Sequence, residues 1–309
     1  MSNETVYQIV TDKIISHLES GVAPWRQPWR ASDQGPRNLD GHRYRGINVL
    51  LLIMESMSEG YQSPYWLTFN QARAKGGSVK KGEKSTVIVF WKKIMVKEKN
   101  EATGKIEKKI IPMLRYYRVF NLDQCEGVKL PRKVLEDQLA DKQEHDHDPI
   151  AEAEAIVNGY KDSPKITRRG ARAFYVPSTD KITVPPMKAY ERREEFYSTL
   201  FHEMAHSTGH ESRLDRFTGK NGAFGSHDYG REELVAEMTS AFLAAEAGIE
   251  ITIPNSAAYL SSWIKTIKED VRAVVVAAGA AQRAADLIMN RTYEYKEEQE
   301  QDQEMALAS

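Results

Sequence analysis

Cysteine is nearly absent from this sequence, whose 309 residues include only Cys125. One thiol cannot form a disulfide within the chain and is no basis for a thiolate zinc site, so the composition favours a reducing compartment. No apolar stretch approaches the roughly 20 residues that a membrane-spanning helix needs. The N-terminus also lacks the pattern of a secretory signal peptide. We therefore expect a cytoplasmic protein without a membrane partner.

A phosphate-binding P-loop is absent as well, because the pattern G-x-x-x-x-G-K-[ST] does not occur, and a nucleotide-driven motor is therefore unsupported. The net charge is −1, from 43 Lys and Arg against 44 Asp and Glu. This average conceals an asymmetry. Residues 1–128 hold 20 basic and 13 acidic residues, a net charge of +7, whereas the remainder holds 23 and 31, a net charge of −8. The asymmetry indicates a basic binding half and a chemically different second half.

The most informative pattern is H-E-x-x-H at residues 202–206. On a helix, residues four apart lie on one face, so His202 and His206 can bind one metal ion. Glu203 can then act as the general base on a water molecule that the metal activates. Apolar residues recur every three or four positions from 190 to 208, and Gly209 follows where a helix C-cap is expected. The sequence therefore predicts a catalytic metal helix.

A catalytic zinc ion needs a third protein ligand and an open position. The extended pattern with a third histidine does not apply, because position 212 is Ser212. A second helix is predicted over 231–243, and it places Glu233 and Glu237 on one face. We expect Glu233 to be the third ligand and Glu237 to orient a ligand histidine, with the exchanged roles as an alternative. Zinc is the expected ion for two histidines and a glutamate, and manganese is possible.

The segment between these two helices includes a glycine-rich loop at 219–230. Such a loop can rim a cleft. We consider three nearby side chains as candidates for polarising a substrate carbonyl: His210, His227 and Tyr229. Taken singly, each of them is better explained as a surface or packing residue.

The basic half interleaves aromatic with basic residues, which is typical of single-stranded nucleic-acid binding because exposed rings stack on unpaired bases while Arg and Lys follow the phosphates. A basic loop with glycines at 75–84 adds to this pattern. The alternative is that the tryptophans are core residues and the lysines a solvated face. The candidate DNA-binding residues are Trp25, Trp29, Arg37, Arg43, Tyr44, Arg45, Asn48, Trp66, Lys75, Lys80, Lys81 and Lys84.

Local signals predict several further elements. Asn48 can cap a helix that ends by Gly60, and Thr68 can cap a short helix that ends at Gly76. The β-branched and aromatic run 86–91 predicts a strand, with 109–120 as its partner. The fold class is α+β, with two domains. We expect a mixed α/β single-stranded-DNA-binding domain, a linker, a zincin-like domain with the H-E-x-x-H motif, and an acidic, disordered tail, at residues 1–128, 129–149, 150–290 and 291–309 respectively.

Several motifs also resemble a known family. The N-terminal ones resemble the N-terminal domain of plasmid-borne ArdC antirestriction proteins, which some plasmid primases share, and the later ones resemble the family's metallopeptidase-like domain. The N-terminal motifs are at residues 24–25, 44–48, 65–72 and 79–84, and the later ones at 202–210, 213–214, 232–237 and 259–263.

The resemblance implies a single-stranded-DNA-binding domain joined to a zincin-like domain. It implies that the protein protects incoming plasmid DNA from restriction during conjugation. Single-stranded DNA is thus the expected partner, together with a host or plasmid protein as a possible substrate. A second hypothesis is a protein that only shields DNA and whose metal site is structural or vestigial. A nuclease is the weakest hypothesis, because H-E-x-x-H with a glutamate ligand is the arrangement of peptide hydrolysis.

Overall fold

Helices and small sheets follow one another along the chain in this computed structural model, so the expected α+β class is confirmed. The structure describes residues 3–23, 25, 35–99, 106–132, 134–135, 149–217, 227–249 and 257–292. The first half has α1 (Asn3–Glu19), β1 (Arg37–Asn38), α2 (Ile47–Glu59), β2 (Tyr65–Leu67), α3 (Phe69–Ala74), β3 (Ser78–Val79), β4 (Thr86–Lys99), β5 (Ile106–Asn121), η2 (Leu122–Gln124) and β6 (Cys125–Glu126). The second half has α5 (Pro149–Gly159), β7 (Lys165–Arg168), β8 (Phe174–Val176), η3 (Pro177–Thr179), β9 (Lys181–Val184), η4 (Met187–Ala189), α6 (Arg193–Ser207), α7 (His227–Ala247), α8 (Ala257–Glu269) and α9 (Ala273–Ile288).

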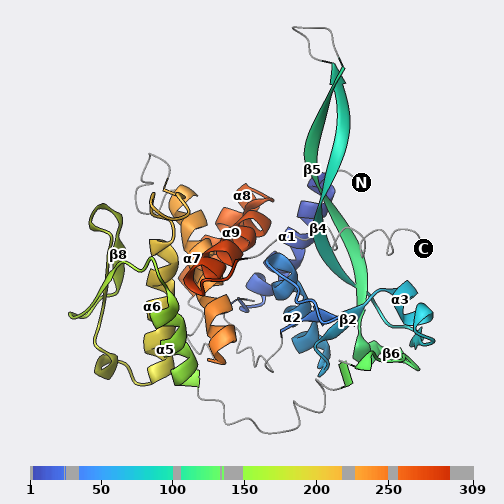
Figure 1. The fold of residues 1–309 in the computed structure, drawn as a ribbon, viewed down its shortest axis with the longest axis horizontal. Helices are drawn as coiled ribbons and strands as arrows, with labels where there is room; N and C mark the ends of the chain where they lie inside the picture. The colour runs from blue at the N-terminus through green and yellow to red at the C-terminus, as the bar shows by residue number, and fades with distance from the viewer. Residues whose placement is uncertain are drawn as a thin grey trace.

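A long two-stranded ribbon dominates the first half. Strands β4 and β5 pair antiparallel without interruption, from Thr86 opposite Val119 to Lys99 opposite Ile106. The lower part of the ribbon belongs to a sheet with the order β1-β2-β5-β4, and the upper part stands out from the body (Figure 1). The expected pairing of 86–91 with 109–120 is confirmed, and both strands are longer than the sequence pattern predicts.

The two predicted helix caps have different outcomes. Thr68 caps α3 as expected: its hydroxyl accepts a hydrogen bond from the backbone of Gln71, whose side chain accepts one from the backbone of Thr68. The prediction for Asn48 is wrong, because α2 begins at Ile47 and Gly46 is its N-cap. Asn48 instead exchanges two hydrogen bonds with the backbone of Val89, at 2.7 and 2.8 Å, which fasten α2 to β4.

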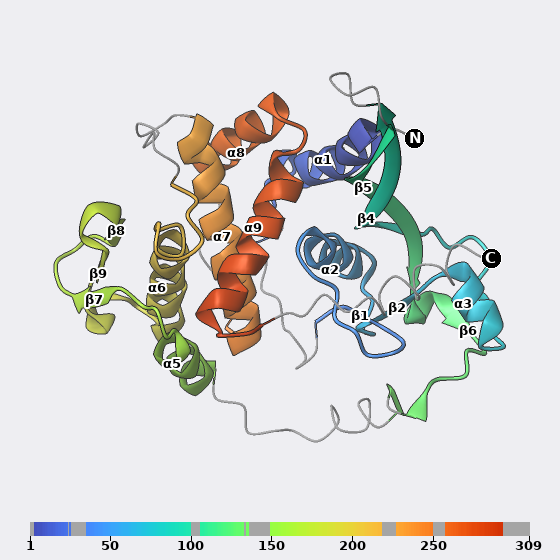
Figure 2. The ribbon, with the colours of Figure 1, turned by 45° about the horizontal axis from the view of Figure 1, so that its top comes forward.

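The second half places a three-stranded sheet, in the order β7-β9-β8, beside a group of helices. Helix α6 follows this sheet and packs against α7, which in turn packs against α9 (Figure 2). Ile182 and Val184 of strand β9 belong to the same buried apolar cluster as one face of α6, so the sheet and the helix share a core. The helix predicted over residues 190–208 is confirmed as α6.

The two halves share their largest cluster of buried residues. Residues of α1 and α2 belong to the same hydrophobic cluster as residues of α6, α7 and α9. Helix α1 packs against α8 and α9, and the hydroxyl of Thr11 donates a hydrogen bond to the carbonyl oxygen of Val271 at 2.7 Å. The described halves are therefore packed as one body, and the boundaries at 128 and 150 stay a prediction.

Trp25 and Trp66 are both completely buried, so the prediction that their rings stack on DNA bases is wrong for this structure. The ring of Trp25 meets that of Trp263 edge to face, with centroids 5.2 Å apart. Trp66 lies in a second cluster with Leu52, Ile88 and Val119. Large apolar surface drives both rings into the core, and proximity in sequence to arginines does not change that.

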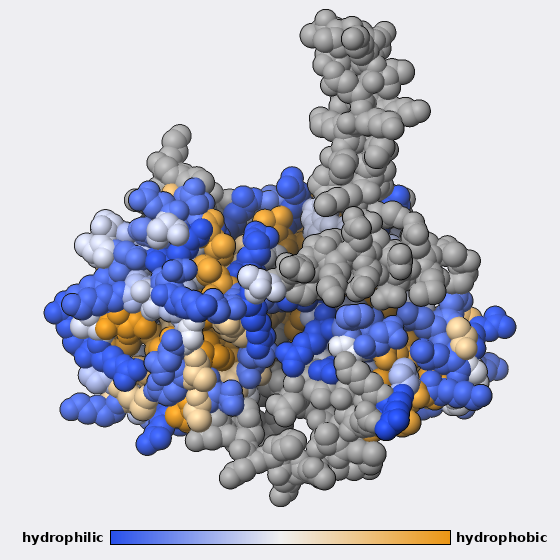
Figure 3. All heavy atoms as spheres, viewed as in Figure 1, coloured by the Kyte–Doolittle hydropathy of each residue, from blue (hydrophilic) through white to orange (hydrophobic). Residues whose placement is uncertain are grey.

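The visible face of the described part is mostly hydrophilic, with smaller hydrophobic areas among the helices (Figure 3). Among the described residues, no helix combines the length and apolar character needed to cross a lipid bilayer.

We predict that Trp25→Ala lowers the free energy of unfolding by about 3–5 kcal/mol, because it opens a cavity where the two halves meet. Trp25→Phe should cost less, since it keeps a ring there and removes an indole N–H that has no hydrogen-bond partner in the described part of the chain. Urea unfolding followed by circular dichroism measures both values. A loss below about 1 kcal/mol for Trp25→Ala would contradict the packing described.

Candidate metal centre

Helix α6 carries the H-E-x-x-H residues on a support that is largely buried. Phe196, Leu200 and Met204 recur along one side and are completely inaccessible to solvent. His202 and His206 project from α6 toward Glu233 of α7. The centroids of their two imidazole rings are 4.7 Å apart. Apolar packing thus fixes the orientation of both histidines.

Three side chains converge between α6 and α7. The Nε2 atoms of His202 and His206 are 3.1 Å apart, and the carboxylate oxygens of Glu233 lie 3.6 and 3.4 Å from them, respectively. Tetrahedral ligand atoms about 2.0–2.2 Å from a zinc ion lie about 3.4 Å from one another. The arrangement therefore fits one divalent ion, and among the described residues this trio forms the one group of metal-binding type.

The electrostatics of the cluster favour a cation. Burial lowers the pKa of His206, but hydrogen bonds to Glu232 and Glu233 outweigh this effect and raise it to about 10. Burial alone would raise the pKa of Glu233, but hydrogen bonds to the two imidazoles and their charges outweigh this effect and hold the pKa well below its usual range. Both shifts have one cause: two carboxylates face two imidazoles, and a positive charge between them is stabilised. A divalent ion meets the same requirement.

Glu203 lies beside this trio and is only 7% exposed. Burial raises the pKa of its carboxyl group, while the neighbouring His202 and His206 oppose that change. The backbone of Tyr175 in strand β8 also acts to lower this pKa, more weakly than the two histidines do. A buried, oriented carboxylate with a raised pKa suits a general base.

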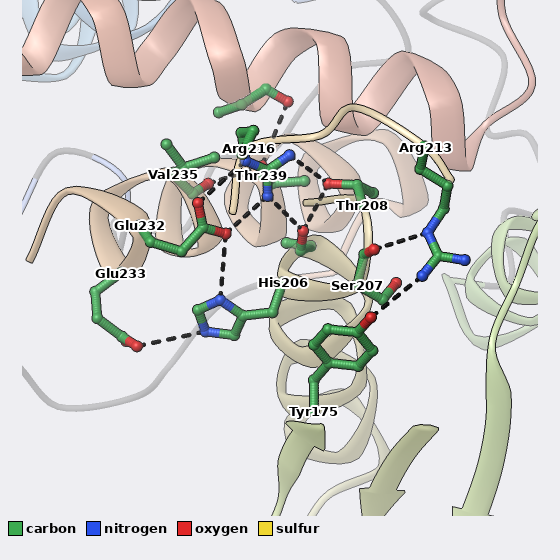
Figure 4. A network of polar contacts seen from close by, with 12 residues as sticks. Tyr175, His206, Ser207, Thr208, Arg213, Arg216, Glu232, Glu233, Val235 and Thr239 are labelled. Carbon is green, nitrogen blue, oxygen red and sulfur yellow. Dashed lines mark hydrogen bonds and ion pairs between the residues drawn. The ribbon is translucent and has the colours of Figure 1, made fainter. Parts of the chain in front are cut away.

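A hydrogen-bonded network holds His206 from behind (Figure 4). The Nδ1 atom of His206 lies 3.4 Å from Glu232, and Arg216 donates hydrogen bonds to both oxygens of that carboxylate at 3.0 and 2.7 Å. Arg216 also donates to the hydroxyl of Thr208 at 2.7 Å. Helix α7 is thereby tied to the end of α6. Sequence reasoning missed both Glu232 and Arg216.

Glu237 was the expected orienting residue. Its carboxylate lies 3.9 Å from Nδ1 of His202, the ring nitrogen that faces away from Glu233. This position suits an orienting role better than a ligand role, and Glu233 alone of the two joins the trio. Glu232 and Glu237 therefore lie behind the two histidines, one behind each.

A second arginine braces the sheet against α6. Arg213 forms an ion pair with Asp180 and donates to the carbonyl oxygen of Ser207 at 2.7 Å. It also donates to the hydroxyl of Tyr175 at 3.3 Å, next to the backbone that contacts Glu203. Its side chain is 3% exposed, and the guanidinium lowers the pKa of Asp180. The position of β8 therefore depends on Arg213, which is buried, and on its ion pair with the partly exposed Asp180.

The candidates for carbonyl polarisation are not brought into this cluster. His210 turns to Ser212, whose hydroxyl lies 2.8 Å from its Nδ1 atom. His227 and Tyr229 belong to the first turn of α7, and their side chains lie outside the described part of the structure. Gly209 packs so closely on Phe217 that an added Cβ would lie 2.7 Å from the ring.

The expected DNA-binding residues fall into a buried group and an accessible group. Arg37 and Asn48 are buried, as are Trp25 and Trp66, so DNA cannot reach them in this conformation. The guanidinium of Arg37 lies 5.9 Å from the centre of the Tyr65 ring, and Asn48 is held by Val89. The prediction that Arg37 and Asn48 contact DNA is therefore wrong for this structure. Both side chains make contacts inside the protein instead. Trp29 lies outside the described residues.

The other basic candidates remain accessible. Lys80, Lys81 and Lys84 are exposed on the segment between β3 and β4, and Lys75 is half-buried nearby. Arg43 is exposed and forms an ion pair with Glu246 at 3.3 Å, whereas Arg45 is half-buried and pairs with Asp286. Tyr44, between them, is half-buried.

Comparison with protein families matches both halves of the chain. The N-terminal domain of anti-restriction factor ArdC matches residues 4–120, and a zincin-like metallopeptidase matches residues 151–280. Fold and site thus define a zincin-like metallopeptidase domain joined to an ArdC-type N-terminal domain, and the second match includes the whole ligand trio.

Individual relatives support this class over nearly the full chain. Two Escherichia coli proteins named DNA primase TraC are 35% identical over 97% and 95% of this chain, which spans only 28% and 20% of their lengths. The uncharacterized protein y4eC of Sinorhizobium fredii is 31% identical, with 91% of this chain and 90% of the relative covered.

Solved structures give the same result. The antirestriction ArdC protein from plasmid R388, in metal-free and Mn(II)-bound forms, matches with TM-scores of 0.74 and 0.73 and identities of 38% and 37%. The matches cover 93% and 94% of this chain and 99% of each solved chain. The chain belongs to the ArdC family of antirestriction proteins, as its motifs predict.

Glu232→Gln tests the network behind His206. We predict at least about tenfold weaker binding of Zn²⁺ or Mn²⁺, because the change removes the charge that orients the imidazole and pairs with Arg216. Calorimetric titration measures the affinity, and the exposed Glu211→Gln, which alters the same charge nearby, is the control. Equal affinities for the two variants would exclude an orienting role for Glu232.

Proposed function

We propose that this protein binds single-stranded DNA and protects plasmid DNA that enters a recipient bacterium by conjugation, using a metal-dependent peptidase site in the cytoplasm. The observation that carries the proposal is the buried Glu203 beside the trio of His202, His206 and Glu233. Hydrolysis at a metal site needs a general base next to the metal ligands, whereas a purely structural metal site does not.

His202, His206 and Glu233 would hold the ion. Two imidazoles and one carboxylate make zinc the default ion, and the Mn(II)-bound relative supports manganese as an alternative. A bound divalent ion supplies a Lewis acid that lowers the pKa of water and polarises a carbonyl group. The orienting carboxylates Glu232 and Glu237 keep the two imidazoles turned toward the ion.

Glu203 would move the proton. Its carboxylate is placed to accept a proton from a water molecule that attacks a peptide carbonyl, and to return that proton to the departing amide nitrogen. The raised pKa supports the first of these roles, because a carboxylate with a higher pKa accepts a proton from water more readily. The burial of Glu203 between the two ligand histidines limits the positions that its carboxylate can take.

The N-terminal half would supply the DNA contact. Its net charge of +7 and the exposed Lys80, Lys81 and Lys84 favour a polyanion. The relationship to the TraC primases supports DNA as that polyanion, because they share this region of the chain. The proposed protein substrate would be a host or plasmid protein that is bound to the same DNA.

A second candidate function is DNA shielding with a structural metal. The observation that favours it is the shared core: α6 and α7, which carry the trio, belong to the cluster that also holds α1 and α2. A metal that fastens α6 to α7 would then stabilise the DNA-binding half without any hydrolysis.

Glu203→Gln separates the two functions. Glutamine keeps the size of the side chain and cannot accept the proton, so we predict unchanged DNA affinity together with loss of protection during transfer into a restricting host. Conjugation efficiency into restricting and non-restricting recipients measures protection. Full protection by the variant would reject the peptidase mechanism and favour shielding.

DNA binding is tested by its salt dependence. We predict that replacing Lys80, Lys81 and Lys84 together by alanine reduces the slope of log affinity against log salt by about 2, since each phosphate contact on single strands contributes about 0.7. Fluorescence anisotropy with a labelled single strand measures the slope. The control replaces three exposed lysines of the other half: Lys161, Lys165 and Lys188. An identical slope for both variants would place the DNA elsewhere.

A further inference from the structure

A cavity of about 420 Å³ opens between the ribbon of the first half and helix α9 of the second. Tyr44, Phe90 and Tyr117 line it from one side. Gly279, Gln282 and Arg283 line it from α9. Its volume lies within the range of small-molecule sites, about 300–1,000 Å³. The metal trio does not line it, so this is a separate site.

Two features keep this space open. Gly279 contributes no side chain to the wall, and a Cβ added there would find only the guanidinium of Arg283 within 4 Å, at 3.9 Å. The rings of Phe90 and Tyr117 meet at 66° with centroids 5.6 Å apart, which prevents them from stacking on each other and filling the gap. Beneath them lies the buried Trp66, which supports the aromatic wall.

The polar side chains of the wall are occupied within the protein. Asn48 is bonded to the backbone of Val89. Gln282 accepts a hydrogen bond from the backbone of Gly46 at 3.0 Å and donates one to Asp286 at 3.2 Å. A bound molecule would therefore be held mainly by stacking of its flat face on aromatic rings, and its polar edges would form few hydrogen bonds with the protein.

The charges at the wall favour an occupant that carries an anion. Arg43, Arg45 and Arg283 line the cavity, against the one carboxylate of Asp286. Arg45 pairs with Asp286, and Arg43 pairs with Glu246. Arg283 is exposed and, among the described residues, forms no ion pair. Its charge remains available for a phosphate.

We propose that this cavity receives one unpaired base of a DNA strand, stacked against Phe90 and Tyr117, with Arg283 on the adjoining phosphate. The proposal rests on the proposed binding of single-stranded DNA and makes it more specific. An aromatic wall, a guanidinium at its rim and satisfied polar groups fit a base of any identity. The consequence is that α9 forms part of the DNA site, although it belongs to the metallopeptidase half.

Filling the cavity tests this directly. Gly279→Leu places a side chain in the space from a helical position where the Cβ meets no obstacle. Gly279→Ala is the matched control, since it makes the same change of backbone freedom and leaves most of the space. The probes are a 20-nucleotide oligothymidylate and a strand of the same length and charge in which tetrahydrofuran residues replace the bases.

We expect Gly279→Leu to bind oligothymidylate about tenfold more weakly than the wild type and Gly279→Ala, because base stacking is lost. All three proteins should bind the abasic strand equally. If Gly279→Leu does not fold, as judged by circular dichroism, Arg283→Gln replaces it, with the exposed Arg172→Gln as its control. The expected result is then weaker binding for Arg283→Gln alone.

The outcomes distinguish this inference from the function on which it rests. Equal binding of oligothymidylate by Gly279→Leu and the wild type overturns the base site while DNA binding stands. A wild type that binds neither strand removes the proposed DNA function itself, and the base site with it. Loss of binding by Gly279→Leu on both strands also overturns the base site, because the effect would not depend on a base.

Discussion

The contact between α6 and α7 is the constraint on which the rest of the structure depends. Helix α6 supplies two imidazoles and α7 supplies the carboxylate of Glu233, so neither helix can form the trio alone. The bond from Arg216 to Glu232 fixes the distance between the two helices at the end where the histidines lie. Because buried charges are costly unless they are paired, removing either partner would leave the other uncompensated and loosen the helix pair. Stability and metal geometry are thus served by the same side chains.

The same helices also support the first half of the chain. Helix α9 packs against α7 on one side and against α1 and α2 on the other, so the metal-bearing pair and the ribbon share one apolar core. Ion pairs at the edge of this core, from Arg43 to Glu246 and from Arg45 to Asp286, join segments far apart in the sequence. The proposed DNA site and the candidate metal site are therefore held at a fixed separation by packing.

Much of the metal centre could be predicted from sequence, because a helix places residues four apart on one face whatever surrounds it. His202, Glu203 and His206 follow from that rule, and the capping box of Thr68 follows from equally local chemistry. The partners behind the histidines could not be found in this way. Glu232 is a neighbour of Glu233 in sequence, and its role depends on Arg216, which only the turn after α6 brings near. The burial of the tryptophans was not predicted either. Trp25 is next to Arg26 and Trp66 belongs to the basic half, and only the tertiary packing shows that their rings face inward.

Helix α9 is the feature with the widest consequence. It is rich in alanine, with ten buried positions over its length, and these positions are shared between partners on opposite sides. A chain severed between residues 128 and 150 would leave complementary apolar surfaces on the two fragments, one along α1 and α2 and the other along α9. Burying such apolar surfaces away from water is favourable, so the two fragments should reassociate when mixed. The regions that match two separate families, residues 4–120 and 151–280, thus form one folding unit because they share a core.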